Sequence, residues 1–362
     1  MSELKTNKIQ TNDTNNVAID NALGLKSYTT SQRDGLTSVA GDMIFNSDDN
    51  KVQAYDGSNW VDLGGAAIEV EYLIIGGGGA GGGGSINWTV GGGGGSGGLR
   101  NSYASENTGG GLSGELPLQC FTGVNYAVSV GGGGAGNATA YTPGGIGTRS
   151  YFAHITGYGG GGGGNYYGTA AGLRNYGGSA GAEGSINSSA IYSRGVVPGQ
   201  GFSAGAGRTY GGANTTMAGG GGGGGSAAGS NAASGAGGNG GTGFTSSITG
   251  SSVVYAGGGG GGGYSSGGSA TGGGGAGKNV DGGAGNAATD NTGGGGGGGT
   301  TAGNTSNTAG GAGGSGVVIL RYPNTFTLAQ SGLTTSNINT DIGGTSDKYT
   351  TITAGTGTVS FS

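Results

Sequence analysis

Alternation of apolar and polar residues predicts short strands at both ends of a long glycine-rich stretch. Residues 68–75 begin with strict alternation and end apolar on both faces, residues 126–130 alternate, and residues 317–322 are almost continuously apolar. Because a strand stands on each side of the stretch, we expect the first and last strands to pair and to clamp the residues between them.

The same patterning predicts a small β-meander near the N-terminus. Residues 42–46, 51–55 and 59–63 are β-prone, and the segments between them are rich in Asp, Asn, Ser and Gly. Such a short piece cannot bury a large apolar core, so we expect it to pack against copies of itself.

Glycine is concentrated between these strand regions. The chain has 104 glycines in 362 residues, four before residue 64 and five after residue 316, which leaves 104 − 4 − 5 = 95 between them. Runs of at least four glycines occupy residues 76–79, 81–84, 91–95, 131–134, 159–164, 219–225, 257–263, 272–275 and 293–299. A flexible linker is the usual interpretation of dense glycine, but the bracketing strands argue against it.

Extended glycine runs can form a folded lattice. A polyproline-II-type helix has three residues per turn, so a run of seven would make a rod of roughly 22 Å. Its backbone groups point outward and must pair with neighbouring rods. Large residues fall between the runs, and we expect Ala, Ser and Thr only at rod ends or in outer layers.

These patterns predict a mostly non-helical fold, a polyglycine-II helix lattice or sandwich capped by short β-strands and flanked by small β modules. We expect an N-terminal module for attachment or oligomerisation at 1–63, the glycine-rich domain at 64–322, and a small C-terminal β module at 323–362.

Composition excludes several classes of function. Only 9% of residues are charged and the net charge is −5, which argues against a basic nucleic-acid surface. No apolar stretch reaches the ~18 residues of a membrane span, so we expect no membrane insertion. A single cysteine and a single histidine exclude a disulfide framework and a histidine-rich metal site. We expect no cofactor, and a buried thiol at Cys120.

Apparent catalytic motifs follow from composition. The stretch 272–278 imitates a phosphate-binding loop, but Asn279 stands where Ser or Thr is needed, and 94–98 fits a nucleophile motif trivially. Glu106 and Glu115 could be offered as a glycosidase pair, but we expect both to be solvated. The sequence therefore predicts a protein that is not an enzyme.

Several segments resemble the glycine-rich domain of bacteriophage structural proteins, which is related in style to the polyglycine-II sandwich adhesins of T-even-like phages. These are VEYLIIGGGG at 70–79, NYAVSVGG at 125–132 and GGSGVVILRY at 313–322. The N-terminal RDGL, GDMIFN and KVQAYDGSNW within 33–60 resemble a module of tail-fibre and appendage proteins, especially of marine phages. Residues 349–361 resemble phage fibre tails. The chain departs from the T-even-like adhesins in carrying the N-terminal module.

The resemblance implies a virion fibre or adhesin subunit, in which loops at one end of the lattice hold aromatic residues that contact the host receptor. Tyr and Trp among Ser, Gly and Asn are also typical of adaptable recognition loops. The candidate receptor-binding residues are Trp88, Tyr103, Tyr141, Tyr166, Tyr167, Tyr176, Tyr192, Arg194, Arg208, Tyr210 and Tyr264. The alternative for these tyrosines is that they cap rod ends or pack trimer seams.

The resemblance also implies partners and a location. We expect a homotrimer, contacts with other virion proteins through residues 1–63, and a host surface polysaccharide or outer-membrane protein as receptor. The protein would be made in the host cytoplasm and reside on the virion. The alternatives are a purely structural head-fibre or capsid-decorating protein, a self-assembling glycine-rich filament and, more distantly, a depolymerase.

Overall fold

The chain forms two compact units in the computed structural model, residues 1–66 (unit 1) and 67–362 (unit 2). The structure describes residues 24–86, 89–137, 142–165, 177–184, 195–208, 214–301 and 306–362.

Unit 1 is a small sheet with one short helix. Its elements are β1 (Ser27–Tyr28), α1 (Thr30–Asp34), β2 (Met43–Asn46), β3 (Lys51–Tyr55) and β4 (Trp60–Asp62), and the strand order is β1-β2-β3-β4. The three predicted strands are thus confirmed. The helix was not predicted, although Thr29 and Gln32 form a capping box at its start.

Polar side chains occupy much of the interior of unit 1. Asn46 and Gln53 are buried, and Asn46 Nδ2 donates to Gln53 Oε1 at 3.1 Å. Gln53 Nε2 in turn donates to Asp62 Oδ1 at 2.7 Å. Ile44 is the buried hydrophobic residue of the described part of this unit.

The described part of unit 2 contains a nine-stranded sheet. Its order is β10-β9-β8-β15-β13-β5-β6, with β14 on β15 and β7 on β5. The strands are β5 (Ala67–Ile75), β6 (Leu99–Asn101), β7 (Leu118–Phe121), β8 (Tyr126–Ser129), β9 (Ser150–Phe152), β10 (Ile155–Gly157), β13 (Val317–Pro323), β14 (Leu328–Asp341) and β15 (Asp347–Phe361). A separate hairpin joins β11 (Phe244–Ser246) to β12 (Val253–Tyr255), and single turns of 3-10 helix lie at Gly109–Gly111 and Asn214–Thr216.

The first and last strands of the glycine-rich region pair, as predicted. β5 and β13 are antiparallel, with Ile75 opposite Val317. The C-terminal residues, however, belong to this same sheet, because β15 pairs with both β13 and β8. Residues 323–362 therefore complete the sheet of unit 2, where we expected a module of their own.

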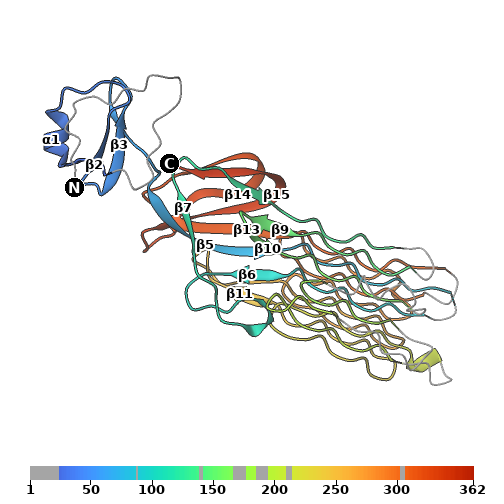
Figure 1. Cartoon of the computed structure of the whole chain (residues 1–362). Coiled ribbons are helices and arrows are strands. Elements are labelled where there is room, and N and C mark those ends of the chain that lie inside the picture. Colours follow the sequence, from blue (N-terminus) through green and yellow to red (C-terminus); the bar gives the residue numbers. More distant parts are fainter. Residues whose placement is uncertain are drawn as a thin grey trace, which may run out of the picture. The chain divides into compact units, whose positions relative to one another are not determined.

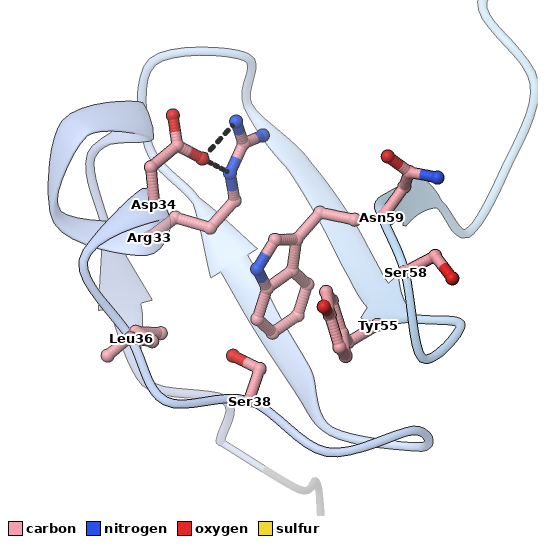
Figure 2. A pocket seen from close by; sticks show the side chains of 8 residues that line it. Arg33, Asp34, Leu36, Ser38, Tyr55, Ser58 and Asn59 are labelled. Atoms are coloured by element: carbon pink, nitrogen blue, oxygen red, sulfur yellow. Dashed lines mark hydrogen bonds and ion pairs between the residues drawn. The ribbon is translucent and has the colours of Figure 1, made fainter.

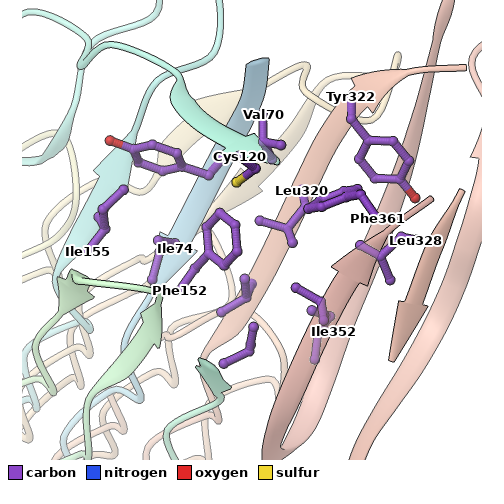
Figure 3. Close-up of a cluster of buried hydrophobic side chains, with 14 of the residues drawn as sticks. Val70, Ile74, Cys120, Phe152, Ile155, Leu320, Tyr322, Leu328, Ile352 and Phe361 are labelled. Atoms are coloured by element: carbon purple, nitrogen blue, oxygen red, sulfur yellow. The ribbon is translucent and has the colours of Figure 1, made fainter. Parts of the chain in front are cut away.

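Both faces of the central strands are buried. Val70, Ile74 and Leu320 point into a cluster that also holds aromatic rings, among them Phe152 and Phe361 (Figure 3). Leu73, Ile75 and Ile319 point to the other face and pack beneath the β11–β12 hairpin. The continuously apolar ends of these strands follow from this burial on two sides.

Extended glycine segments, called rods here, continue from the strands and form the lattice seen in Figure 1. The rod 76–84 follows β5 directly, and its N–H groups point in three directions with a period of three. Residues 76, 79 and 82 donate to the rod 91–98, residues 77 and 80 to the rod 144–148, and residues 78 and 81 to the rod 308–316. This threefold pattern is that of a polyglycine-II lattice, as predicted.

The rod 76–84 is also an acceptor on its remaining sides. The rods 131–137, 159–164 and 293–300 donate to its carbonyl groups, with N···O distances of 2.8 to 2.9 Å. The rod is therefore enclosed by backbone alone, and its residues are buried. A Cβ on Gly78 would overlap the carbonyl of Gly294.

Long glycine runs coincide with interior positions in the lattice. The rods enclosed on all sides in this way are 76–84, 91–98, 219–225, 257–263 and 293–300. One outer rod carries a larger residue at every third position, at Ala236, Asn239 and Thr242, all at least partly exposed. The runs of seven glycines, 219–225, 257–263 and 293–299, are all interior, so a run of that length indicates an interior rod.

The expected restriction of Ala and Ser to rod ends and outer layers is too strict. Ala80 lies in the middle of an interior rod and is fully buried. Ser96 is also buried, and its hydroxyl bonds to that of Ser179 at 2.9 Å. The interior glycines of the rod 76–84 have no positive φ, so an L-residue can stand in such a rod wherever a gap accepts its Cβ.

Candidate functional site

The rods turn back at the end of the lattice that lies away from the sheet, here called the lattice tip. β-bridges at this end join Gly84 to Thr308 and Val90 to Thr300. Gly184 lies against Val90 and the Cα of Asn165. Bridges from Arg208 to Ala218 and from Ala218 to Gly263 extend the same end across the lattice. The described residues that flank 87–88, 138–141, 209–213 and 302–305 all lie at the lattice tip.

Small polar side chains fix the bases of the loops at the tip. The Thr89 hydroxyl accepts from the Ser85 N–H at 2.6 Å and donates to the Ser85 carbonyl at 3.1 Å. Ile86 N–H donates to Asn307 Oδ1 at 3.1 Å, which ties this loop base to the next one. These residues were not predicted, because the candidate residues were chosen for aromatic side chains. Ser, Thr or Asn at the borders of glycine runs is the signal that identifies them.

The same device closes a third loop. Asn137 Nδ2 donates to the Pro143 carbonyl at 3.1 Å, across the base of residues 138–142. The Thr308 hydroxyl also donates to the Thr300 carbonyl at 2.7 Å. Each of these loops therefore starts from an anchored pair of residues on the lattice.

Two predicted site residues, Arg208 and Tyr264, lie at the tip, each bonded to the rod 217–225. Arg208 N–H donates to the Ala218 carbonyl at 2.8 Å, and Tyr264 N–H donates to the neighbouring Met217 carbonyl at 3.1 Å. The Arg208 side chain is exposed and Tyr264 is half-buried. The tip therefore carries a guanidinium group and a phenol ring on two rods that lie on different sides of the rod 217–225.

Tyr103 lies at the other end of the lattice, against the sheet. Arg321 sits over its ring, 4.7 Å from the centroid, and Nη1 of Arg321 donates to the Tyr103 hydroxyl at 3.0 Å. Arg321 also pairs with Asp347 at 2.8 Å. Tyr103 thus packs within the sheet end and is separated from Arg208 and Tyr264.

The remaining predicted site residues lie outside the described residues. They are Trp88, Tyr141, Tyr166, Tyr167, Tyr176, Tyr192, Arg194 and Tyr210.

Glu106 and Glu115 are bonded to the protein, so the expectation that both are solvated is wrong. Glu115 accepts from Arg100 Nη2 and the Tyr72 hydroxyl, both at 2.7 Å. Burial would raise the pKa of Glu115, but these hydrogen bonds, with another from Thr108, lower it overall. Glu106 accepts from the Ser247 N–H at 2.7 Å. Both carboxylates fasten loops to the sheet end.

Cys120 is a free, buried thiol, as predicted. Burial raises its pKa to about 12, so the thiolate form that reacts is scarce near neutral pH. Among the described residues, no group of His, Cys, Asp and Glu could hold a metal ion. The described helices include none long and apolar enough to cross a membrane.

Comparison with known proteins gives one finding. A family model described as a glycine-rich domain matches residues 53–323, from β3 of unit 1 to the end of β13 in unit 2. No curated protein and no solved structure gives a significant match.

Proposed function

We propose that this chain, which belongs to the glycine-rich domain family, is a bacteriophage fibre or adhesin subunit that binds the host surface through loops of the lattice tip. The observation that carries this proposal is the polarity of unit 2. The chain enters unit 2 at Ala67 in the sheet, and the rod that follows β5 ends at the lattice tip.

The lattice suits the display of binding loops. The rod 76–84 spans roughly 25 Å, and its backbone is bonded on every side. Anchored loop bases reduce the conformational entropy that a loop loses on binding. The described part of the tip is largely Gly, Ser, Thr and Asn, so it favours a ligand rich in hydroxyl groups, such as a surface polysaccharide, with an outer-membrane protein as the second candidate.

Unit 1 supports the proposed association with copies of the chain or with other virion proteins. It buries little apolar surface, while Val39, Met43, Val61 and Leu63 are between 42% and 66% exposed. A homotrimer or a virion partner would cover such residues, consistent with an attachment role for residues 1–63. The proposed location is the virion surface, after synthesis in the host cytoplasm.

A self-assembling filament receives less support than an adhesin. Lateral growth of the lattice needs glycine along a whole outward face, so that another rod can approach. Outer rods carry exposed side chains at Ala312 and Asn239, and the rod 131–137, where Gly132 and Gly133 are exposed, also carries an exposed Ala135. A head-fibre or capsid-decorating protein without a receptor remains the alternative that the experiment below separates.

Replacement of Trp88, Tyr166 and Tyr167 by Ala tests the proposal. We expect phage or purified protein carrying all three changes to lose host-cell adsorption while keeping the wild-type thermal unfolding temperature. Tyr158→Ala is the matched control, since Tyr158 is 47% exposed at the sheet end of the lattice. Unchanged adsorption by the triple variant would contradict a receptor role and favour the structural alternative.

The proposal is binding without catalysis. Incubation of the protein with host polysaccharide should leave the chain-length distribution unchanged on gel filtration. Shortened chains would show that the protein is a depolymerase.

A further inference from the structure

Unit 1 contains a cleft of about 360 Å³. Its lining, which defines the unit 1 cleft, is Arg33, Asp34, Leu36, Ser38, Tyr55, Ser58, Asn59 and Trp60. Figure 2 shows Arg33 and Asp34 across the cleft from Ser58 and Asn59. The volume lies in the usual range of small-ligand sites, roughly 300–1,000 Å³.

Two aromatic rings form one wall of the cleft. Tyr55 ends β3 and Trp60 begins β4, and the two residues are opposite each other in the antiparallel pair. Their ring centroids lie 5.4 Å apart, with planes inclined by 53°. Both side chains are half-buried. The β3–β4 pairing therefore fixes an angled aromatic surface that is partly open to solvent.

The turn between these strands holds polar side chains at the rim. Asp56 Oδ1 accepts from the N–H groups of Ser58 and Asn59, both at 2.7 Å. These hydrogen bonds lower the pKa of Asp56, so the turn keeps its form at neutral pH. The exposed side chains of Ser58 and Asn59 thus project from a fixed backbone beside the rings.

An ion pair forms the opposite rim. Arg33 Nε and Nη2 donate to a single carboxylate oxygen, Asp34 Oδ1, at 2.8 and 2.7 Å. Arg33 Nη1 donates to Gln53 Oε1 at 3.0 Å, which holds the guanidinium group from the protein side. Asp34 is 60% exposed, and its Oδ2 accepts no hydrogen bond from the described part of the chain. A positioned acceptor therefore faces solvent at the cleft.

A second hollow of about 260 Å³ continues from the first. It shares Leu36, Ser38 and Trp60 with the cleft and extends to Asp42 and to Tyr28, whose ring lies under the Lys26 ammonium group at 5.0 Å. Trp60 thus stands where the two hollows meet. An elongated ligand with repeating ring-sized units fits this arrangement better than a compact one.

We propose that the unit 1 cleft is a carbohydrate-binding site for a neutral oligosaccharide, with one pyranose ring packed on Trp60 and Tyr55. The apolar face of a pyranose packs on aromatic rings, and its hydroxyl groups both donate and accept. Asp34 and Ser38 would accept from those hydroxyls, and the Asn59 amide would bond them from the other rim. The next sugar unit occupies the second hollow.

The charge of the cleft selects against other small ligands. The Arg33 guanidinium is neutralised by Asp34, and the free oxygen at the rim belongs to a carboxylate. A phosphate or carboxylate ligand would be repelled there, and a purely apolar ligand would leave the rim groups without partners. This site is separate from the lattice tip, so it does not depend on the proposed receptor loops.

Tryptophan fluorescence tests the proposal in the full-length chain. The sequence has two tryptophans, so Trp88→Phe leaves Trp60 as the sole reporter. We expect a saturable change in its emission on titration with β-linked disaccharides of glucose, galactose or N-acetylglucosamine. Asp34→Ala in this background should weaken the affinity by about tenfold. Asn59→Ala, which removes an amide group from the opposite rim, should weaken the affinity as well.

Matched controls make the result decisive. Val61→Ala changes the exposed residue next to Trp60 and should leave the titration unchanged. Circular dichroism and Tyr fluorescence will show whether each variant is folded, and the two rim variants serve as independent checks on each other. A flat titration with every sugar would overturn the proposal, and so would saturation by a proline-rich peptide alone. Trp60 reports binding in unit 1 only. The titration can therefore succeed or fail whatever the result of the host-adsorption experiment on the tip loops.

Discussion

The sheet and the lattice of unit 2 are stabilised in opposite ways, although the same chain segments run through both. In the sheet, large side chains such as Leu320 and Phe361 are fully buried against one another. In the lattice, the rods approach so closely that backbone carbonyls occupy the space of the side chains. The hydrophobic effect stabilises the sheet. The lattice can form only if its buried backbone N–H and carbonyl groups are hydrogen-bonded to neighbouring rods.

The junction between the two regions explains how the lattice is specified. β5 pairs with β6 and β13, and the rod that follows β5 bonds to the rods adjoining those same two strands. The register chosen by apolar side chains in the sheet is therefore passed to rods that have no side chains. A glycine rod alone carries little information about register, so the sheet serves as its template.

The largest effect should come from adding a side chain inside the lattice. In Gly222→Val, the new Cβ would overlap the carbonyl group of Gly94, which belongs to the backbone of a neighbouring interior rod. Because no rotamer avoids this overlap, we expect the variant to fail to form the lattice. Soluble yield and calorimetric unfolding measure this, and a native melting curve would show that backbone packing is looser than described.

A side-chain deletion in the sheet should have a large but smaller effect. Leu320 is completely buried in the cluster on one face of the sheet. We expect Leu320→Ala to lower the free energy of unfolding by about 2–5 kcal/mol. Denaturant titration of unit 2 gives this value, and a loss below that range would mean that the lattice carries more of the stability than the sheet.

A pH-dependent effect should come from the Glu115 network at the sheet end. The pKa of Glu115 is lower in the folded protein than in the unfolded chain, where it is about 4.3. The ionised carboxylate therefore stabilises the fold at pH values above the unfolded pKa, and this stabilisation is lost as pH falls through the folded pKa. We expect Glu115→Gln to cost about 1–3 kcal/mol at neutral pH. The difference from wild type should shrink on acidification; a constant difference in thermal unfolding across this pH range would contradict it.

The smallest effect should come from a glycine on the lattice surface. Gly132 lies in an outer rod and is exposed, and a Cβ there would meet nothing closer than the Thr148 hydroxyl at 4.0 Å. We expect Gly132→Ala to be neutral or to stabilise by no more than about 1 kcal/mol, through the unfolded state. This variant is the control for Gly222→Val, and a marked loss of stability would mean that the outer face of this rod is covered.

The sequence predicts the type of fold better than its assembly in space. Glycine runs and flanking strands identify the rods, and the run length separates the rod 219–225, which is interior, from the outer rod around Asn239. The neighbours of each rod cannot be predicted in this way, because a rod without side chains has no sequence pattern that selects its partners. For this reason the placement of Arg208 and Tyr264 on the same rod, 217–225, could not be predicted, nor could the position of Tyr103 under Arg321.

The pairing of β15 with the other strands of the unit 2 sheet could not be predicted from the sequence either. Threonine-rich alternation in 347–361 predicts strand structure but does not say that β15 inserts between β13 and β8. That choice depends on long-range packing of Ile352, Val359 and Phe361 in the shared cluster. The polar anchors of the tip loops were missed for a related reason, since Ser and Thr are abundant throughout the glycine-rich region.

The continuity of β5 with an interior rod has a mechanical consequence. A pull between the lattice tip and Ala67 runs along a single straight segment through the middle of unit 2. The hydrogen bonds on all sides of that segment lie across the direction of pull, so they are loaded together in shear and do not open one after another. Unit 2 should therefore resist axial tension far better than a hairpin peeled from its end.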